Sequence, residues 1–138
     1  MKILLQGKEY KYHDDSYLKD QLSDCIKDEM INLDTLPYEK IYLVYDYLCG
    51  LSTMLISEPF PTKELQEKNE EINSRINKVN HMQKFLKDKG KEEESKNVML
   101  KFIGTLLSFD EEYSKYGDQI VEENNYGILR WIKMERSY

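Results

Sequence analysis

The chain has 138 residues, of which 40% are hydrophobic and 33% are charged, and its formal net charge is −6. This length suits a single domain, and the apolar content is too high for a disordered tail. The negative charge would repel phosphate backbones, so we expect no direct binding to nucleic acid and favour a basic protein surface as partner.

The acidic residues are concentrated in the first half of the chain. Residues 1–61 contain 6 Lys and no Arg against 11 Asp or Glu, whereas residues 62–138 contain 14 Lys or Arg against 15 Asp or Glu. We expect no signal peptide, because Lys2 is followed by only three apolar residues. The longest apolar run, residues 41–56, contains Asp46 and is too short for a membrane span. These features predict a cytoplasmic protein, in which Cys25 and Cys49 are reduced and buried.

The N-terminal segment MKILLQGKEYKYH predicts a β-hairpin with a two-residue loop at Gly7-Lys8. The expected cross-strand pairs are Leu5 with Tyr10 and Ile3 with Tyr12. All four side chains then lie on one face of the hairpin. A two-stranded hairpin is marginally stable in water, so this face should pack on the helices that follow.

A first helix is predicted from a cap at Asp15 or Ser16 to Met30 or Leu33. On its outer side Asp20, Asp24 and Asp28 recur at i, i+4 and i+8. Like charges at this spacing cost a helix a few tenths of a kcal/mol per pair. The repeat is either a solvated face or a docking surface for a partner.

A second helix is predicted after a cap at Asp34 or Thr35, with Pro37 in its first turn. It is apolar nearly all round, which is typical of a central, buried helix. Asp46 is the only charge in residues 41–56. It either pairs with a lysine such as Lys101 or lines a pocket with neighbouring tyrosines, namely Tyr42, Tyr45 and Tyr47.

Residues 62–100 predict an antiparallel helical hairpin, a coiled-coil-like arm. Thr62 caps its first helix, and Gly90 ends that helix before a return helix that begins near Glu92. The heptad seam of the first helix is Leu65, Asn69, Ile72, Ile76, Val79, Gln83 and Leu86. One seam is apolar and the rest is charged, so this helix should pack along one side only.

Residues 101–138 should return to the core and end in a C-terminal element. Gly117 is expected to end a helix, and residues 126–134 fit either a helix or a strand. Gly50 and Gly104 lie inside apolar helices, where we predict a close approach of the second and fourth helices. The expected fold is therefore mainly α, as a single domain over residues 1–138 with a short β-hairpin and a helical arm.

Few motifs of catalysis occur in the sequence. It has no glycine-rich phosphate loop, and neither His13 nor His81 has a metal-ligand partner one helical turn away. Both cysteines are at core-like positions and there is no nucleophile elbow. We therefore expect no enzymatic activity, no metal and no cofactor.

The acidic residues share the N-terminal third with a group of tyrosines, a residue type enriched at interfaces. Asp20, Asp24, Asp28, Tyr10 and Tyr12 are thus the candidate partner-binding residues. We expect a protein-binding inhibitor or adaptor that attaches to a basic protein, such as a nucleic-acid-binding host protein. One alternative is an assembly protein that forms homo-oligomers through residues 62–100. A further alternative is a small-ligand-binding or catalytic pocket around Asp46.

Composition and the first residues both bear on origin. The chain has no alanine and has 17 Lys against 3 Arg, which is typical of AT-rich coding in a low-GC bacterium or its phage. The first twelve residues, MKILLQGKEYKY, resemble the opening of several small phage proteins, including tail-assembly chaperones. The resemblance covers only those residues and assigns no family. It implies a phage or mobile-element protein that acts in the host cytoplasm.

Overall fold

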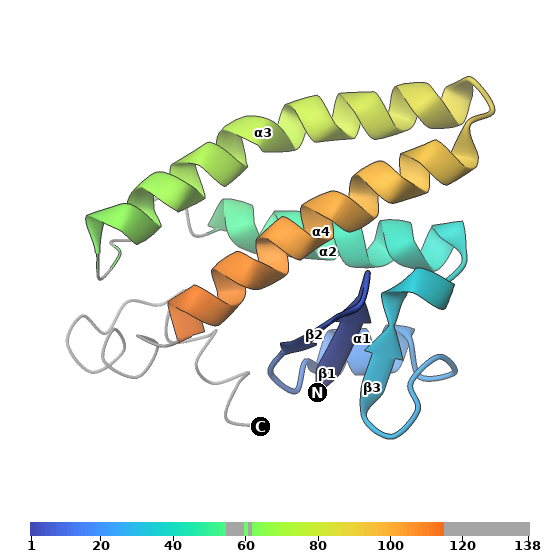
Figure 1. Cartoon of the computed structure of the whole chain (residues 1–138), viewed down its shortest axis with the longest axis horizontal. Helices are drawn as coiled ribbons and strands as arrows, with labels where there is room; N and C mark the ends of the chain where they lie inside the picture. Colours follow the sequence, from blue (N-terminus) through green and yellow to red (C-terminus); the bar gives the residue numbers. More distant parts are fainter. Residues whose placement is uncertain (55–59, 61, 115–138) are drawn as a thin grey trace.

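The computed structural model describes residues 1–54, 60 and 62–114 (Figure 1). The predicted helix end at Gly117 and the element over residues 126–134 lie outside these residues. Along the chain the elements are β1 (Lys2–Leu5), β2 (Lys8–Lys11), α1 (Ser16–Gln21), β3 (Met30–Asn32), α2 (Tyr38–Met54), α3 (Lys63–Asp88) and α4 (Glu92–Ser114). A short 3-10 helix, Leu33–Thr35, precedes α2. The predicted mainly α architecture with a short β element is confirmed.

The N-terminal hairpin forms, but its turn lies one residue earlier than predicted. The loop residues are Gln6 and Gly7, with φ of 49° and 81°, and the pairs are Ile3 with Tyr10 and Leu5 with Lys8. Two positive φ values are characteristic of a type I′ turn, whose twist matches that of the strands. The pairing moves by two residues, and a shift of two keeps every side chain on its predicted face. Accordingly, four apolar side chains are buried on one face: Ile3, Leu5, Tyr10 and Tyr12.

The predicted first helix, extending to Met30 or Leu33, is wrong, because α1 ends at Gln21. The chain then turns and forms β3, which pairs in parallel with β1 to give the strand order β2-β1-β3. Ile31 lies opposite Ile3, and both are about 1% exposed. Ile31 and Leu33 are buried at alternate positions, which is the period of a strand. Pairing with β1 and burial of these side chains override the helical pattern of residues 22–30.

The helix α2 lies behind α4 in the view of Figure 1, and it contacts both α3 and α4. Pro37 directly precedes it, and its carbonyl accepts the amide of Ile41 at 3.1 Å. One side carries the buried residues Ile41, Val44, Tyr45, Leu48 and Cys49. Tyr42, Asp46 and Gly50 are exposed, so α2 is not buried all round as predicted.

The arm has the predicted form, with α3 and α4 antiparallel over their length (Figure 1). The Thr62 hydroxyl caps α3 by accepting the amide of Leu65 at 3.1 Å. At its other end Gly90 has a φ of 77°, and the amide of Lys91 donates to the carbonyl of Leu86 at 2.8 Å. This bond is characteristic of a Schellman motif. The seam is confirmed by the buried residues Leu65, Asn69, Ile72 and Gln83.

A buried hydrogen-bond cluster joins α2 to the distal part of the arm. The Tyr38 hydroxyl lies 2.8 Å from Ser95 Oγ and 3.1 Å from Gln83 Oε1. The Ser95 hydroxyl donates to the main-chain carbonyl of Gln83 at 2.7 Å. The polar seam residue Gln83 thereby has partners, which lowers the cost of its burial.

The predicted approach of α2 and α4 at two glycines is wrong. Gly50 is exposed, and a Cβ there would meet no atom within 4 Å. At Gly104 a Cβ would lie 3.5 Å from Leu5 Cδ2 and 3.6 Å from Tyr10 Oη. The close approach at Gly104 is therefore between α4 and the β-hairpin.

Candidate functional site

Three aspartates between the last turn of α1 and β3 form what we call the acidic surface: Asp20, Asp24 and Asp28. All three are exposed, as predicted. They do not form the predicted helical row, because only Asp20 belongs to α1. The three carboxylates therefore project from one short segment without the stacking of one helical face.

A tight turn holds the last of these aspartates outward. The main-chain groups of Lys27 and Met30 exchange two hydrogen bonds, of 2.9 and 3.1 Å. Asp28 and Glu29 between them have φ of 52° and 59°, which again is the pattern of a type I′ turn. The amide of Lys2 donates to the Glu29 carbonyl at 3.0 Å. Because β1 anchors the turn in this way, the Asp28 carboxylate stands at its tip.

The segment has a strongly negative local charge. Residues 20–34 contain five acidic residues and one lysine. Among the described residues, Asp20, Asp24 and Asp28 form no ion pair. Asp24 Oδ1 lies 3.6 Å from the Cys25 thiol, which donates to it. Lys40 Nζ is close to this segment, where it donates to the Gln21 carbonyl at 2.9 Å, but it forms no ion pair with these three carboxylates in the described chain. The excess of acidic residues leaves a negative field at the surface.

Tyr10 and Tyr12 are not part of this surface. Their side chains are 7% and 6% exposed, so the expectation that they lie on the partner-binding surface is wrong. The alternation of the hairpin directs both toward the helices. The tyrosine exposed here is Tyr17, which is 44% exposed and stacks on Tyr47 at 4.6 Å. Tyr17 lies one helical turn before Asp20 and can supply an apolar contact beside the carboxylates.

The residues predicted to surround Asp46 do not converge on a pocket in the described structure. Asp46 and Tyr42 are exposed, but only Tyr42 lines a pocket, which it shares with Gln83 and Lys84 of α3. No ion pair joins Asp46 to Lys101 in the described part of the chain. Tyr45 is buried, and its hydroxyl donates to Asn80 Oδ1 at 2.5 Å. Burial raises the pKa of Tyr45 above its usual value. Tyr45 thus links α2 to α3.

Sequence reasoning missed a buried network around Asp15. Its carboxylate accepts the Leu18 amide at 3.0 Å and the Tyr47 hydroxyl at 2.7 Å, and His13 Nε2 lies 3.5 Å away. Burial raises the pKa of Asp15, but the hydrogen bonds from His13, Leu18 and Tyr47 outweigh it, so the net pKa is below its usual value. Asp15 is 0% exposed, so the network orders the start of α1 and is closed to a substrate.

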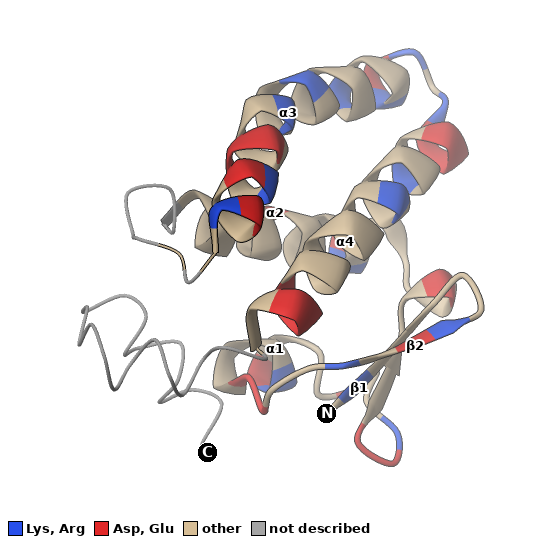
Figure 2. Ribbon diagram, turned by 60° about the vertical axis from the view of Figure 1, so that its left-hand side comes forward, with Lys and Arg blue, Asp and Glu red and all other residues tan. Residues whose placement is uncertain are grey.

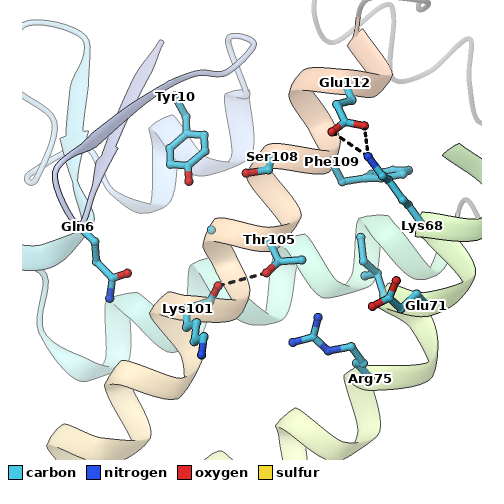
Figure 3. Close-up of a pocket in the computed structure, with 12 residues that line it drawn as sticks. Gln6, Tyr10, Lys68, Glu71, Arg75, Lys101, Thr105, Ser108, Phe109 and Glu112 are labelled. Carbon is cyan, nitrogen blue, oxygen red and sulfur yellow. Dashed lines mark hydrogen bonds and ion pairs between the residues drawn. The ribbon is translucent and has the colours of Figure 1, made fainter. Parts of the chain in front are cut away.

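A second missed feature is an open groove of about 440 Å³ between the hairpin and the arm (Figure 3). Side chains from three elements line it, including the cations Lys68, Arg75 and Lys101. These residues are far apart in sequence and show no motif. The cations lie on α3 and α4, which pair along the arm. Gln6 and Tyr10 complete the groove from the β-hairpin, whose packing against α4 the sequence pattern did not specify.

Comparisons with protein-family models, curated proteins and solved structures give no match to this chain. Within the described residues no group of three or more His, Cys, Asp or Glu side chains could hold a metal ion. No helix in the described part of the chain has the length and apolar character needed to cross a membrane.

Proposed function

We propose that this chain is a non-enzymatic inhibitor or adaptor that binds a basic protein through the acidic surface. The observation that carries the proposal is the exposure of three carboxylates that form no ion pair within the described chain. The partner would present lysines or arginines, as a nucleic-acid-binding protein does. A phage or mobile-element origin and action in the host cytoplasm belong to the same proposal, on the basis of composition.

The acidic surface can attract a basic partner, and Tyr17 beside it can contact that partner once it is bound. Negative charge at the surface accelerates the encounter with a basic partner, an effect that salt screens. Tyrosine beside such charges is a common anchor residue at interfaces. Tyr17 has this position, since it is half exposed and its ring is already ordered by stacking on Tyr47.

The test is capture of partners from a host lysate by tagged chains. One variant combines Asp20→Lys, Asp24→Lys and Asp28→Asn; asparagine is used at position 28 because it tolerates the positive φ there. A control variant with the same charge change alters three exposed residues of the arm: Glu67→Lys, Glu70→Lys and Glu93→Gln. Wild type and control should capture the same basic protein, and the acidic-surface variant should lose it. Equal capture by all three chains would refute the proposal.

A second candidate function, self-assembly through the arm, is favoured by one observation. Met82 and Phe85, one turn apart on α3, are 55% and 54% exposed. Exposed apolar neighbours of this size can mark a contact surface. Sedimentation over a concentration series should then show association that Met82→Ser with Phe85→Ser abolishes. A wild-type chain that is monomeric at every concentration would exclude it.

A further inference from the structure

The groove between the hairpin and the arm combines walls from three separate elements. Gln6 and Tyr10 come from the hairpin, Ile72 and Arg75 from α3, and Phe109 from α4. At about 440 Å³ it lies within the size range of small-molecule sites. Gly104 also lines the groove, at the point where α4 packs closely against Leu5 and Tyr10 of the β-hairpin.

One of the three groove cations is neutralised from within the chain. Lys68 Nζ lies 2.8 Å from Glu112 Oε2 and 3.5 Å from Glu64 Oε1. The hydrogen bond with Glu112 is the main cause of a raised pKa of Lys68. Lys68 and Glu112 therefore contribute little net charge to the groove.

The other two cations face the groove from opposite helices. In Figure 3 the Arg75 side chain extends from α3 toward α4, where Lys101 is located. Neither forms an ion pair with another residue that the structure describes. The Arg75 guanidinium lies 5.4 Å from the centre of the Phe102 ring. This cation–π contact helps to order a side chain suited to bidentate binding of an oxyanion.

Neutral polar groups and apolar surface complete the lining. The Gln6 amide and the Ser108 hydroxyl face the same space as the cations (Figure 3). The Thr105 hydroxyl donates to the Lys101 carbonyl at 3.4 Å. Ile72 and Phe109 provide apolar surface beside them. The groove can thus hold an anionic group at one part and a less polar group at another.

We propose that this groove binds a small organic phosphate. A phosphate monoester carries a charge of about −1.5 to −2 at neutral pH and has three acceptor oxygens. Two unpaired cations and adjacent neutral donors match that group better than they match a carboxylate, which carries a single charge. The site is separate from the acidic surface, so it adds to the proposed protein-binding function and does not depend on it.

Substitution of Glu71 should change phosphate affinity in the opposite direction to substitution of the cations. Glu71 lines the groove one helical turn before Arg75, and no ion pair holds it within the described chain. Its carboxylate should repel a bound phosphate. Glu71→Gln should therefore tighten binding, whereas Arg75→Gln and Lys101→Gln should weaken it by about tenfold each.

The measurement is calorimetric titration of the full chain with AMP, ribose 5-phosphate and inorganic phosphate, with adenosine, ribose and citrate as comparisons. Lys78→Gln is the matched control, because Lys78 is an exposed cation of α3 outside the groove. We expect organic phosphates to bind, the uncharged compounds to fail, and citrate to bind more weakly. Lys78→Gln should leave affinity unchanged.

Several results would overturn the proposal. These are no binding of any phosphate at millimolar concentration, equal affinity for AMP and adenosine, or equal loss in Arg75→Gln, Lys101→Gln and Lys78→Gln. Tighter binding of citrate would reassign the site to a carboxylate. Lys101 is exposed, so Lys101→Gln should fold even if Arg75→Gln does not. Loss of protein capture with phosphate binding intact would identify failure of the acidic surface alone.

Discussion

The buried Asp15 carboxylate holds the start of α1 in place. It caps the N-terminus of α1 by accepting the Leu18 amide, accepts a hydrogen bond from the Tyr47 hydroxyl and lies beside His13. A buried carboxylate with three donors is stable only as the anion. The start of α1, and with it the position of Tyr17 and Asp20, thus depends on the ionisation of Asp15.

This dependence predicts an acid-sensitive contribution to stability. Because the folded pKa of Asp15 is below its usual value, the stabilisation is present at neutral pH and is lost as pH falls below about 4. Asp15→Asn keeps an acceptor for the Leu18 amide but loses the charge. It should cost about 1–2 kcal/mol at neutral pH, and the difference from wild type should shrink toward acid in urea unfolding at a series of pH values. A difference independent of pH would contradict this role.

The two cysteines should differ in reactivity. Both are free, but burial raises the pKa of the Cys49 thiol to about 12. Burial and the Asp24 carboxylate also raise the pKa of Cys25, which is only half-buried. Since the thiolate is the reactive form, a thiol reagent such as DTNB near neutral pH should modify Cys25 slowly and Cys49 only after unfolding. Equal rates for both thiols in the folded chain would show that Cys49 is accessible.

At the scale of elements, two helix glycines provide opposite predictions. Gly50 is solvent-exposed in the middle of α2, with space for a methyl group. Gly50→Ala should therefore stabilise the fold by about 1 kcal/mol. Gly90 has a φ of 77° at the end of α3, so Gly90→Ala should destabilise it by about 1 kcal/mol. Chemical denaturation of both variants measures the difference. The same sign for both would contradict the described conformations.

The elements that the sequence predicted correctly depend on local interactions. The cap at Thr62, the heptad seam and the Gly90 turn are each set by residues within a few positions of one another. β3 could not be predicted in this way, because Ile31 pairs with Ile3 across 28 positions. Helical spacing of Leu18, Leu22 and Ile26 hid the strand that follows.

In the candidate site, too, the features set by local residues could be predicted and those set by contacts between distant segments could not. Exposure of Asp20, Asp24 and Asp28 follows from their charge, which resists burial wherever the helix ends. The burial of Tyr10 and Tyr12, and the groove that the β-hairpin completes beside Arg75 and Lys101, depend on how the β-hairpin docks on the arm. Such contacts between distant segments leave no pattern in a single sequence.

At the scale of the whole molecule, charge is divided between two regions. Residues 20–34 carry five acidic residues and one lysine, whereas residues 72–91 carry six Lys or Arg and one Asp. Figure 2 shows lysines and arginines along the distal half of α3, and acidic residues on the first half of α3 and at the start of α4. A partner with a basic surface should therefore be attracted to the acidic surface and repelled by the distal part of α3.

The most direct test measures the association rate constant between this chain and its captured basic partner as a function of ionic strength. We expect a fast rate at low salt that falls steeply as salt is added. The rate should be at least about tenfold lower when Asp20, Asp24 and Asp28 carry the substitutions described above. The arm control with the same charge change should behave as wild type. Equal rates and equal salt dependence for all three chains would contradict the claim that the acidic surface recognises the partner.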